Sequence, residues 1–411
     1  MAMATENVSA ECCVVGGGPA GMMLGLLLAR AGVRVTVLEK HKDFLRDFRG
    51  DTVHPSTLEI LTEIGLFERF DKLKQHKAHD LKISFGDRMQ PFVDFHGLKP
   101  FDYIALVPQW DLLNLLASAG RDYANFNLRM STKATGLIEE NGRVVGVHAE
   151  GLTGSFDIRA NLVLGTDGRH STLRDAAKFD PIEYGAPMDV LWFRIPRMPD
   201  DPEDVFGRVS RGHMMVMLNR DEYWQCAFVV PKGDNDMLRT KPVESFREEV
   251  ANVAPFIRDR MDALATWDDV KFLEVKVNRL PTWHKPGLLL IGDAAHAMSP
   301  VGGVGINLAV QDAVAAANVL APALLNGGTP DEPVLARVQK RREFPTKFTQ
   351  GLQLQIQKRV ISRALATSSN AIEVPGLLRF LLTFRFIRHI PARLIGYGIR
   401  REHVHSGAKT R

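Results

Sequence analysis

The stretch ECCVVGGGPAGMMLGLLLARAGVRVTVLEK, residues 11–40, decides the fold of this chain. Its pattern predicts a short buried strand at 11–15, a glycine-rich turn, a helix to about residue 30 and a second strand at 33–38. The turn contains the motif GxGxxG. Because this motif follows a strand and opens a helix, it predicts a βαβ unit that binds a dinucleotide.

Each glycine of the motif has a physical role in such a turn. Gly16 allows the tight turn, Gly18 lets the backbone approach a pyrophosphate, and Gly21 lets helix and strand pack closely. The helix N-terminus then presents N–H groups to phosphate. Glu39 ends the second strand, where it can accept hydrogen bonds from ribose hydroxyls and disfavours a 2′-phosphate. The site therefore predicts FAD or NAD; the alternative is a turn that packs only against its own helix.

A second strand–turn–helix lies far along the chain, at residues 288–307, LLLIGDAAHAMSPVGGVGIN. The predicted strand delivers Asp293 to a turn, where its carboxylate can accept hydrogen bonds from a polyol such as a ribityl chain. The glycines of VGGVG permit a backbone that lies close to a flat ring, and the helix that follows directs its positive end toward that ring. These features favour a flavin over NAD alone. His296 could serve as a general base, but a structural role is preferred.

The rest of the chain is organised differently. Residues 188–196, 213–219 and 222–230 predict a mostly antiparallel sheet, and the chain is mainly helical after residue 332. The fold class is therefore α/β: a Rossmann-like FAD-binding domain with an inserted, mostly antiparallel substrate-binding sheet and C-terminal helices. The predicted domains are 1–75, 102–180 and 270–340 for FAD binding, 76–101 and 181–269 for substrate binding, and 341–411 for the C-terminal helical region.

Two local signals refine this picture. Asn141-Gly142 lies between apolar runs and predicts a tight hairpin. Ser56 followed by Glu59 predicts a capping box for a helix that runs to about Ile64.

Charge and cysteine content exclude several classes of protein. The 411 residues contain 52 Lys and Arg against 48 Asp and Glu, a net charge of +4. Residues 377–411 hold eight of the basic residues and one acid, Glu402, so the remainder carries 44 positive and 47 negative groups, a net of −3. A nucleic-acid-binding body is therefore not expected. Three cysteines without a CxxC pair predict a reduced, cytoplasmic protein with no metal site.

The basic tail predicts an amphipathic helix, with Phe380, Leu381, Phe384 and residues 387–390 interspersed with arginines. Such a helix could lie on an anionic membrane. The preferred alternative is a capping helix that buries its apolar face on the body or on a second subunit, because Pro391 should shorten the helix and no second anchor is visible.

Together, the GxGxxG motif, the Asp-Gly pair at Asp167 and the Gly-Asp pair at Asp293 resemble those of class A flavoprotein monooxygenases, the FAD-dependent aromatic hydroxylases typified by para-hydroxybenzoate hydroxylase. The resemblance extends to the helix around 342–355. It implies that Arg49 reaches the pyrophosphate, where the alternative is an ion pair with Asp47 or Asp51. The implied FAD-binding residues are Gly16, Gly18, Ala20, Gly21, Glu39, Arg49, Gln109, Asp167, Gly292, Asp293, Gly305, Ile306 and Asn307.

The resemblance also implies a reaction. NADPH or NADH, a transient visitor without a second GxGxxG motif, reduces the FAD, and O₂ then forms a C4a-hydroperoxide that hydroxylates an aromatic or quinone-like small molecule. Two alternatives remain: an FAD-dependent reductase or dehydrogenase of an isoprenoid or quinone, and a flavin-bound membrane-peripheral assembly protein. A monomer or homodimer is expected. The candidate pocket residues are Pro300, Tyr223, Gln225, Trp192 and Met215, and the candidate substrate bases are Tyr103, Tyr223, His54 and His213.

Overall fold

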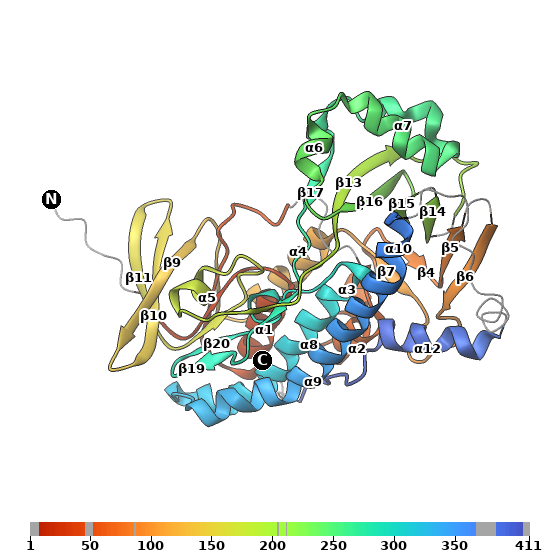
Figure 1. Ribbon diagram of the computed structural model, residues 1–411. Coiled ribbons are helices and arrows are strands. Elements are labelled where there is room, and N and C mark those ends of the chain that lie inside the picture. Colours follow the sequence, from red (N-terminus) through yellow and green to blue (C-terminus); the bar gives the residue numbers. More distant parts are fainter. Residues whose placement is uncertain are drawn as a thin grey trace.

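The computed structural model describes residues 8–45, 52–85, 88–203, 205–210, 212–366 and 384–405. Two large sheets organise the chain, with helices packed between and around them (Figure 1). The first sheet is built on parallel strands in the order β8-β2-β1-β11-β20. Its strands are β1 (Val8–Val15), β2 (Val35–Leu38), β8 (Phe126–Arg129), β11 (Gly154–Gly165) and β20 (Leu288–Leu290), with β19 (His284–Lys285) antiparallel at one edge.

A long hairpin extends from this sheet. Strands β9 (Lys133–Glu140) and β10 (Arg143–Gly151) pair with each other, and β10 also pairs with the first half of β11. Asn141 and Gly142 form the turn, both with positive φ, 49° and 77°. The hairpin predicted from Asn-Gly is therefore confirmed.

The second sheet is mostly antiparallel, in the order β17-β13-β16-β15-β14-β5-β6, and only β14 and β5 pair in parallel. Its strands are β5 (Asp80–Phe85), β6 (Arg88–Asp94), β13 (Met188–Pro196), β14 (Val205–Ser210), β15 (His213–Asn219), β16 (Tyr223–Pro231) and β17 (Lys271–Leu273). The sequence predicted β13 and β15 with these bounds. Smaller sheets join β3 (Thr52–Val53), β7 (Ile104–Leu106) and β4 (His76–Ala78), and β12 (Ile182–Glu183) with β18 (Asn278–Arg279).

The helices that matter for the site lie around and between the sheets. They are α1 (Pro19–Ala31), α2 (Pro55–Glu63), α3 (Phe67–Asp71), α4 (Gln109–Arg121), α5 (Thr172–Ala176), α6 (Asn235–Arg239), α7 (Val243–Val253), α8 (Gly305–Leu324), α9 (Glu332–Ile356), the π-helical turn η6 (Gln357–Ile361), α10 (Ser362–Ala366) and α12 (Arg385–Gly396). Helices α6 and α7 cover the outer side of the second sheet (Figure 1).

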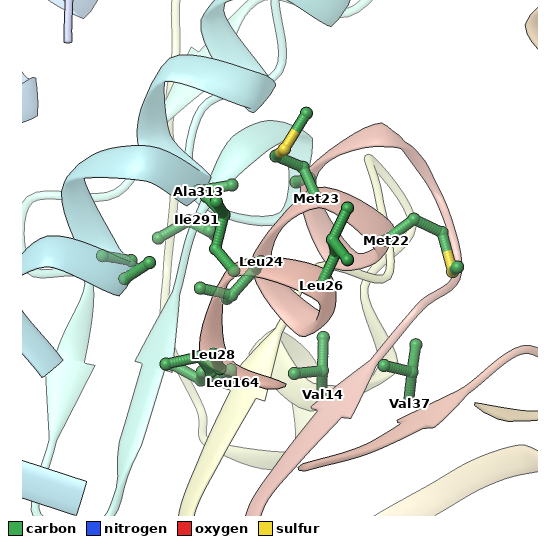
Figure 2. Close-up of a cluster of buried hydrophobic side chains, with 14 of the residues drawn as sticks. Val14, Met22, Met23, Leu24, Leu26, Leu28, Val37, Leu164, Ile291 and Ala313 are labelled. Atoms are coloured by element: carbon green, nitrogen blue, oxygen red, sulfur yellow. The ribbon is translucent and has the colours of Figure 1, made fainter. Parts of the chain in front are cut away.

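Helix α1 is the centre of the main core. Its side chains Met22, Leu26 and Leu28 lie over Val14 of β1 and the neighbouring strands, and Leu24 lies toward α8 (Figure 2). Each fully buried Leu or Met contributes about 1.5–3 kcal/mol relative to an exposed side chain. Burial on almost every side explains why this helix carries no charge before Arg30. Helix α8 is long and apolar enough to cross a membrane, but most of it is buried as a core helix.

Two local expectations were wrong. Helix α2 begins at Pro55 with His54 as its N-cap, so Ser56 is not a capping residue. Its hydroxyl oxygen instead lies 2.6 Å from Asn307 Oδ1 and 3.1 Å from the Gly396 carbonyl oxygen, because tertiary partners outcompete the local cap. Pro391 does not end the tail helix either: α12 continues to Gly396 and is anchored on the body by buried Ala392.

The described part of the tail docks on the rest of the chain. Ala392 and Tyr397 belong to an apolar cluster with Phe95, and the Tyr397 hydroxyl donates to the Phe101 carbonyl at 2.6 Å. Glu402 is buried beside two arginines of α9. Arg379, Phe380 and Leu381 lie outside the described residues. Residues 384–405 therefore dock on the body as the preferred expectation required, but the apolar face of the helix is buried only in part, because Phe384, Phe386 and Ile390 are exposed.

Candidate functional site

The site begins where the parallel strands end. Strands β1, β2, β11 and β20 run in the same direction, so the residues that follow them emerge at one edge of the sheet, where ligands bind in open α/β folds. The Gly16 N–H donates to the Leu38 carbonyl at 2.8 Å. The Thr166 hydroxyl lies 2.9 Å from the Val15 carbonyl oxygen and 2.8 Å from that of Gly16. These contacts join the GxGxxG turn to the end of β2 and to the residue before Asp167.

The glycines of the motif separate into two kinds. Gly16 has a φ of +109°, and a Cβ on it would lie 2.5 Å from the Thr166 carbonyl oxygen. A Cβ on Gly21 would lie 1.9 Å from the Gly16 carbonyl oxygen, so neither position has room for a side chain. A Cβ on Gly18 or on Gly305 would meet nothing within 4 Å. These two glycines stand at the N-termini of α1 and α8, so open space lies where N–H groups can face a phosphate or a flat ring. The glycines therefore fit an extended flavin dinucleotide.

Glu39 lies where a ribose-binding carboxylate is expected. Its Oε2 accepts a hydrogen bond from the Gly17 N–H at 3.0 Å, and Oε1 accepts from the His41 N–H at 2.9 Å. The side chain is buried and oriented by the glycine turn itself. A carboxylate has about four acceptor positions, so both oxygens keep capacity for hydroxyl donors.

Asp293 and Asp167 differ in how many contacts their carboxylates make within the protein. Asp293 follows β20, is 30% exposed, and has Oδ2 at 3.2 Å from Nη2 of Arg169. Asp167 follows β11, where Oδ1 accepts from the Ser171 hydroxyl at 2.6 Å and Oδ2 from the Leu173 N–H at 3.1 Å. Burial raises the pKa of Asp167, and these hydrogen bonds oppose the shift. Asp167 therefore organises the start of α5, whereas Asp293 is the more available carboxylate.

The glycine loop before α8 is fixed from two directions. The Thr52 hydroxyl donates to the Gly303 carbonyl at 2.9 Å, and Asn307 Oδ1 accepts from the hydroxyls of Ser56 and Thr57. His54 lies fully buried with Nε2 at 3.1 Å from the Gly303 carbonyl oxygen and Nδ1 at 2.8 Å from that of Ile395. The loop is thus tied to α2 and, through His54, to the C-terminal segment.

His54 is poorly suited to act as a substrate base. Burial lowers its pKa to about 4, although the two backbone contacts act in the opposite direction. Both ring nitrogens face carbonyl oxygens of the protein, and the ring has no exposed surface. A buried ring held between two backbone carbonyls positions the loop and is not available to a substrate.

A buried ionic network behind the site was missed from the sequence. Asp312 of α8 accepts from the Gly292 N–H at 3.1 Å, and its oxygens lie 2.6 Å from His296 Nε2 and 2.8 Å from Arg342 Nε. Burial opposes ionisation of Asp312, but His296 and Arg342 outweigh it and lower the pKa of Asp312. Asp312 is the only charged side chain in the apolar helix α8, and this isolated charge could have indicated a buried ionic partner from the sequence. His296 also packs on Trp283, so its position agrees with the structural role preferred for it.

The second sheet separates the pocket candidates onto two faces. Trp192 pairs with Ala227, which pairs with Val216, so these residues share the face that packs toward α9 and α12. Met215 pairs with Phe228 and lies in the core under α7, on the opposite face. The two pocket candidates Met215 and Trp192 therefore lie on opposite faces of the sheet, because the strand register offsets their positions by one residue.

The other candidates are placed as follows. Gln225 is buried on the Trp192 face, and its Oε1 accepts from Arg220 Nε at 3.2 Å. Tyr223 begins β16, with the Arg194 guanidinium 4.8 Å from its ring centre. His213 lies on the α7 face beside Phe228. Lys77 lies over the ring of Tyr103, whose pKa burial raises.

The remaining expected cofactor residues lie at the same edge or outside the described range. Gln109 is the first residue of α4 and is partly buried. Gly292 has a φ of +58°, and Ile306 and Asn307 are buried in the first turn of α8. Ala20 is buried in the first turn of α1. Arg49 lies outside the described residues, so its assignment stays a prediction.

Residues 9–351 match the model of a protein family described as FAD binding domain, and the chain belongs to that family. It is 32% identical to 6-methylpretetramide 4-monooxygenase of Streptomyces rimosus over 84% of this chain and 79% of that protein. It is 24% identical to para-nitrophenol 4-monooxygenase of Pseudomonas sp. strain WBC-3, over 77% of this chain and 79% of the relative.

Solved structures share the fold at lower identity. PqsL of Pseudomonas aeruginosa in complex with 2-aminobenzoylacetate has a TM-score of 0.75 at 20% identity and covers 87% of this chain and 98% of its own. OxyS anhydrotetracycline hydroxylase from Streptomyces rimosus has a TM-score of 0.72 at 22% identity, and the match covers 95% of this chain and 76% of OxyS.

The protein is therefore an FAD-dependent aromatic monooxygenase of the para-hydroxybenzoate hydroxylase-like fold. It uses NAD(P)H and O₂, as is typical of the family, and acts on a small aromatic molecule. These findings favour hydroxylation over the reductase and assembly-protein alternatives.

Proposed function

We propose that this enzyme hydroxylates a fused-ring phenolic compound, bound between the second sheet and the loop at residues 299–307. The observation that carries the substrate class is the 32% identity to a 6-methylpretetramide monooxygenase, which spans most of both chains. The likeness to an anhydrotetracycline hydroxylase supports the fold alone. The sheet face that carries Trp192, Val216 and Ala227 is apolar and suits a flat multi-ring ligand.

In this proposal FAD lies along the carboxyl edge of the first sheet. The space beside Gly18 at the N-terminus of α1 would hold its pyrophosphate, because the peptide N–H groups and the helix dipole favour negative charge there. Glu39 accepts hydrogen bonds from the ribose, and Asp293 accepts from the ribityl chain while Arg169 fixes its orientation. When bound and reduced by NAD(P)H, FAD supplies the activated oxygen for hydroxylation.

The protein contributes orientation and charge stabilisation. The N-terminus of α8 at Gly305 directs partial positive charge toward the flat ring, and the clamped Gly303 loop holds that backbone still. Pro300 lies near the start of this loop, and in this proposal it faces the substrate. We assign no protein base, since His54 is buried and His213 lies on the far face of the sheet.

The C-terminal segment acts, in this proposal, as an intramolecular clamp on the flavin loop and not as a membrane anchor. The Ile395 carbonyl contacts His54, and Glu402 reaches the network that holds Gly292. These contacts join the tail to the proposed cofactor site through His54 and through the pair of Arg342 and Asp312.

The test is a substrate screen on the purified, FAD-loaded enzyme. 2-Hydroxyanthracene and 2-naphthol should stimulate NADPH oxidation and O₂ uptake more strongly than phenol or 4-nitrophenol, with ¹⁸O from ¹⁸O₂ in the product. A colourless protein that FAD does not reconstitute would contradict the cofactor assignment. Preference for single-ring phenols would overturn the proposed substrate class while leaving the monooxygenase reaction in place.

A further inference from the structure

Three glutamines on one helix face hold the chain that leads into the glycine loop. Gln350, Gln353 and Gln357 lie on α9 and η6, and all three side chains are buried. They contact residues 297–301, the segment that connects the Gly292 turn to the loop before α8.

Gln350 and Gln353 form a matched pair. Gln350 Nε2 donates to the carbonyls of Asn278 and Ala297 at 2.8 and 2.9 Å. Gln353 Nε2 donates to the carbonyls of Ser299 and Val301 at 2.9 and 2.8 Å. Because a carbonyl can only accept, these contacts identify the amide nitrogen and oxygen of both side chains.

The two amide oxygens have different surroundings. Gln350 Oε1 accepts a hydrogen bond from Arg279 Nη1 at 2.9 Å. Gln353 Oε1 has no hydrogen-bond partner in the described part of the chain, although its side chain belongs to a residue that is only 3% exposed. Leaving a buried acceptor unsatisfied is costly, because the group loses its hydrogen bond to water without gaining another, so such an atom requires an explanation.

The position of Gln353 offers an explanation for its unpaired amide oxygen. Ser299 and Val301 flank Pro300, so the Gln353 amide nitrogen holds the backbone on both sides of the residue expected beside the flavin. The next residue, Leu354, packs against the second sheet in the cluster that also contacts Trp192. The same helix continues through η6 and rises as α10 toward β15 (Figure 1). Gln353 therefore lies in the seam between the flavin loop and the second sheet, one helical turn before the π-helical turn η6, a feature frequent at functional sites.

We infer that the amide oxygen of Gln353 accepts a hydrogen bond from a hydroxyl group of the aromatic substrate. The inference rests on the proposed function, because it requires a phenolic ligand in this seam. It assigns Gln353 two tasks: its nitrogen holds the loop around Pro300, and its oxygen selects a hydroxylated ring. A site built to hydrogen-bond a hydroxyl discriminates against the analogue that lacks it.

The experiment compares matched variants of the FAD-loaded enzyme. Gln353→Met and Gln350→Met each lose donation to two carbonyls, but only the first loses the unused oxygen. Gln353→Lys also removes the oxygen while it keeps a nitrogen donor for the loop. Binding is measured anaerobically, without NADPH, by the change in flavin absorbance on titration with 2-hydroxyanthracene and with 2-methoxyanthracene. FAD affinity and thermal stability are measured for each variant.

The wild type should bind the hydroxy probe more tightly than the methoxy probe. Both Gln353 variants should raise the ratio of the hydroxy-probe Kd to the methoxy-probe Kd by about three- to tenfold, the effect of one neutral hydrogen bond, while loss of the loop contacts weakens both probes alike. Gln350→Met should leave this ratio unchanged, even where loss of its contacts to the loop segment lowers the melting temperature or changes both Kd values. The preference for the hydroxyl should therefore disappear only in the Gln353 variants.

Other outcomes overturn the inference. An equal rise of this Kd ratio in Gln350→Met and Gln353→Met would assign the effect to the loop, and altered FAD affinity with unchanged probe affinity would assign the oxygen to the cofactor. Retained discrimination in Gln353→Lys would also contradict the assignment. If the wild type binds neither probe, the proposed fused-ring substrate fails first, and the inference fails with it.

Discussion

Oδ1 of Asp312 lies 2.8 Å from Nε of Arg342, and both side chains are almost completely inaccessible to solvent. The same carboxylate holds the Gly292 N–H, and the same guanidinium lies 3.4 Å from Glu402. The turn that presents Asp293 is thus connected through α8 and α9 to the C-terminal segment. A buried ion pair of this kind is weak support for stability in itself, but loss of one partner leaves an uncompensated charge.

Asp312→Asn should therefore lower the free energy of unfolding by about 3 kcal/mol, because it leaves Arg342 buried with one carboxylate fewer. Urea unfolding of the apoprotein measures this change. A double-mutant cycle with Arg342→Met should give a coupling energy of about 1–3 kcal/mol. Additive effects of the two substitutions would contradict the network.

Asp293→Ala should raise the Kd for FAD about tenfold or more, since it removes a carboxylate acceptor and leaves Arg169 without this partner. Flavin fluorescence on titration of the apoenzyme measures the affinity. Asp262→Ala, at a well-exposed carboxylate far from the site, serves as the control. Full flavin content in Asp293→Ala would show that the second cofactor site is misassigned.

The two kinds of glycine should respond differently to alanine. Gly18→Ala introduces a Cβ into open space at a φ of −76°, so the stability of the apoprotein should change by less than about 1 kcal/mol while FAD binds more weakly. Gly21→Ala would bring a Cβ to 1.9 Å from the Gly16 carbonyl oxygen, so the fold itself should be destabilised. Melting temperatures of the apoproteins and FAD titrations separate the two effects. Undiminished FAD affinity in Gly18→Ala would exclude the pyrophosphate from this space.

The pKa of His54 should make stability depend on pH. Its value in the folded chain, about 4, lies below the ordinary value of 6.5, so the unfolded chain binds a proton first as the pH falls. Stability is therefore complete above pH 6.5 and is lost toward pH 4, by at most about 3 kcal/mol.

Urea unfolding between pH 4.5 and 7.5 tests this dependence. His54→Gln should flatten the slope below pH 6.5, whereas His405→Gln, at an exposed position, should leave the slope as it is in the wild type. An unchanged slope in His54→Gln would mean that the ring is protonated in the folded protein.

The sequence predicted the parts of this fold that depend on local pattern. The GxGxxG turn, the Asn141 hairpin and the strands at 188–196 and 213–219 follow from residue spacing and turn chemistry. The expected cofactor residues Gly16, Glu39 and Asp293 lie at one edge of the sheet, because parallel strands end together.

Features that depend on contacts distant in the chain could not be predicted in this way. Ser56 fits a capping box by sequence, but its hydroxyl bonds to residues more than 250 positions away. The face on which Met215 lies depends on the register between β15 and β16, which alternation alone does not give. The partners of Asp312 and Gln353 likewise come from other segments of the chain.

The last prediction concerns two neighbours in the C-terminal segment. Glu402 is buried between Arg341 and Arg342, whereas the side chain of Arg401 is 43% exposed in its pair with Glu59. Glu402→Gln should lower the free energy of unfolding by about 3 kcal/mol, because two guanidinium groups lose a charged partner. Arg401→Ala should change it by less than about 1 kcal/mol, since an exposed pair is screened by water.

Urea unfolding of both variants, with flotation of the wild type on vesicles of phosphatidylcholine and phosphatidylserine, tests whether the tail belongs to the body. A docked clamp predicts unequal effects at the two positions and protein that stays with the soluble fraction. Equal small effects, together with flotation on the anionic vesicles, would show that the segment leaves the body for a lipid surface, and the clamp on the flavin loop would have to be abandoned.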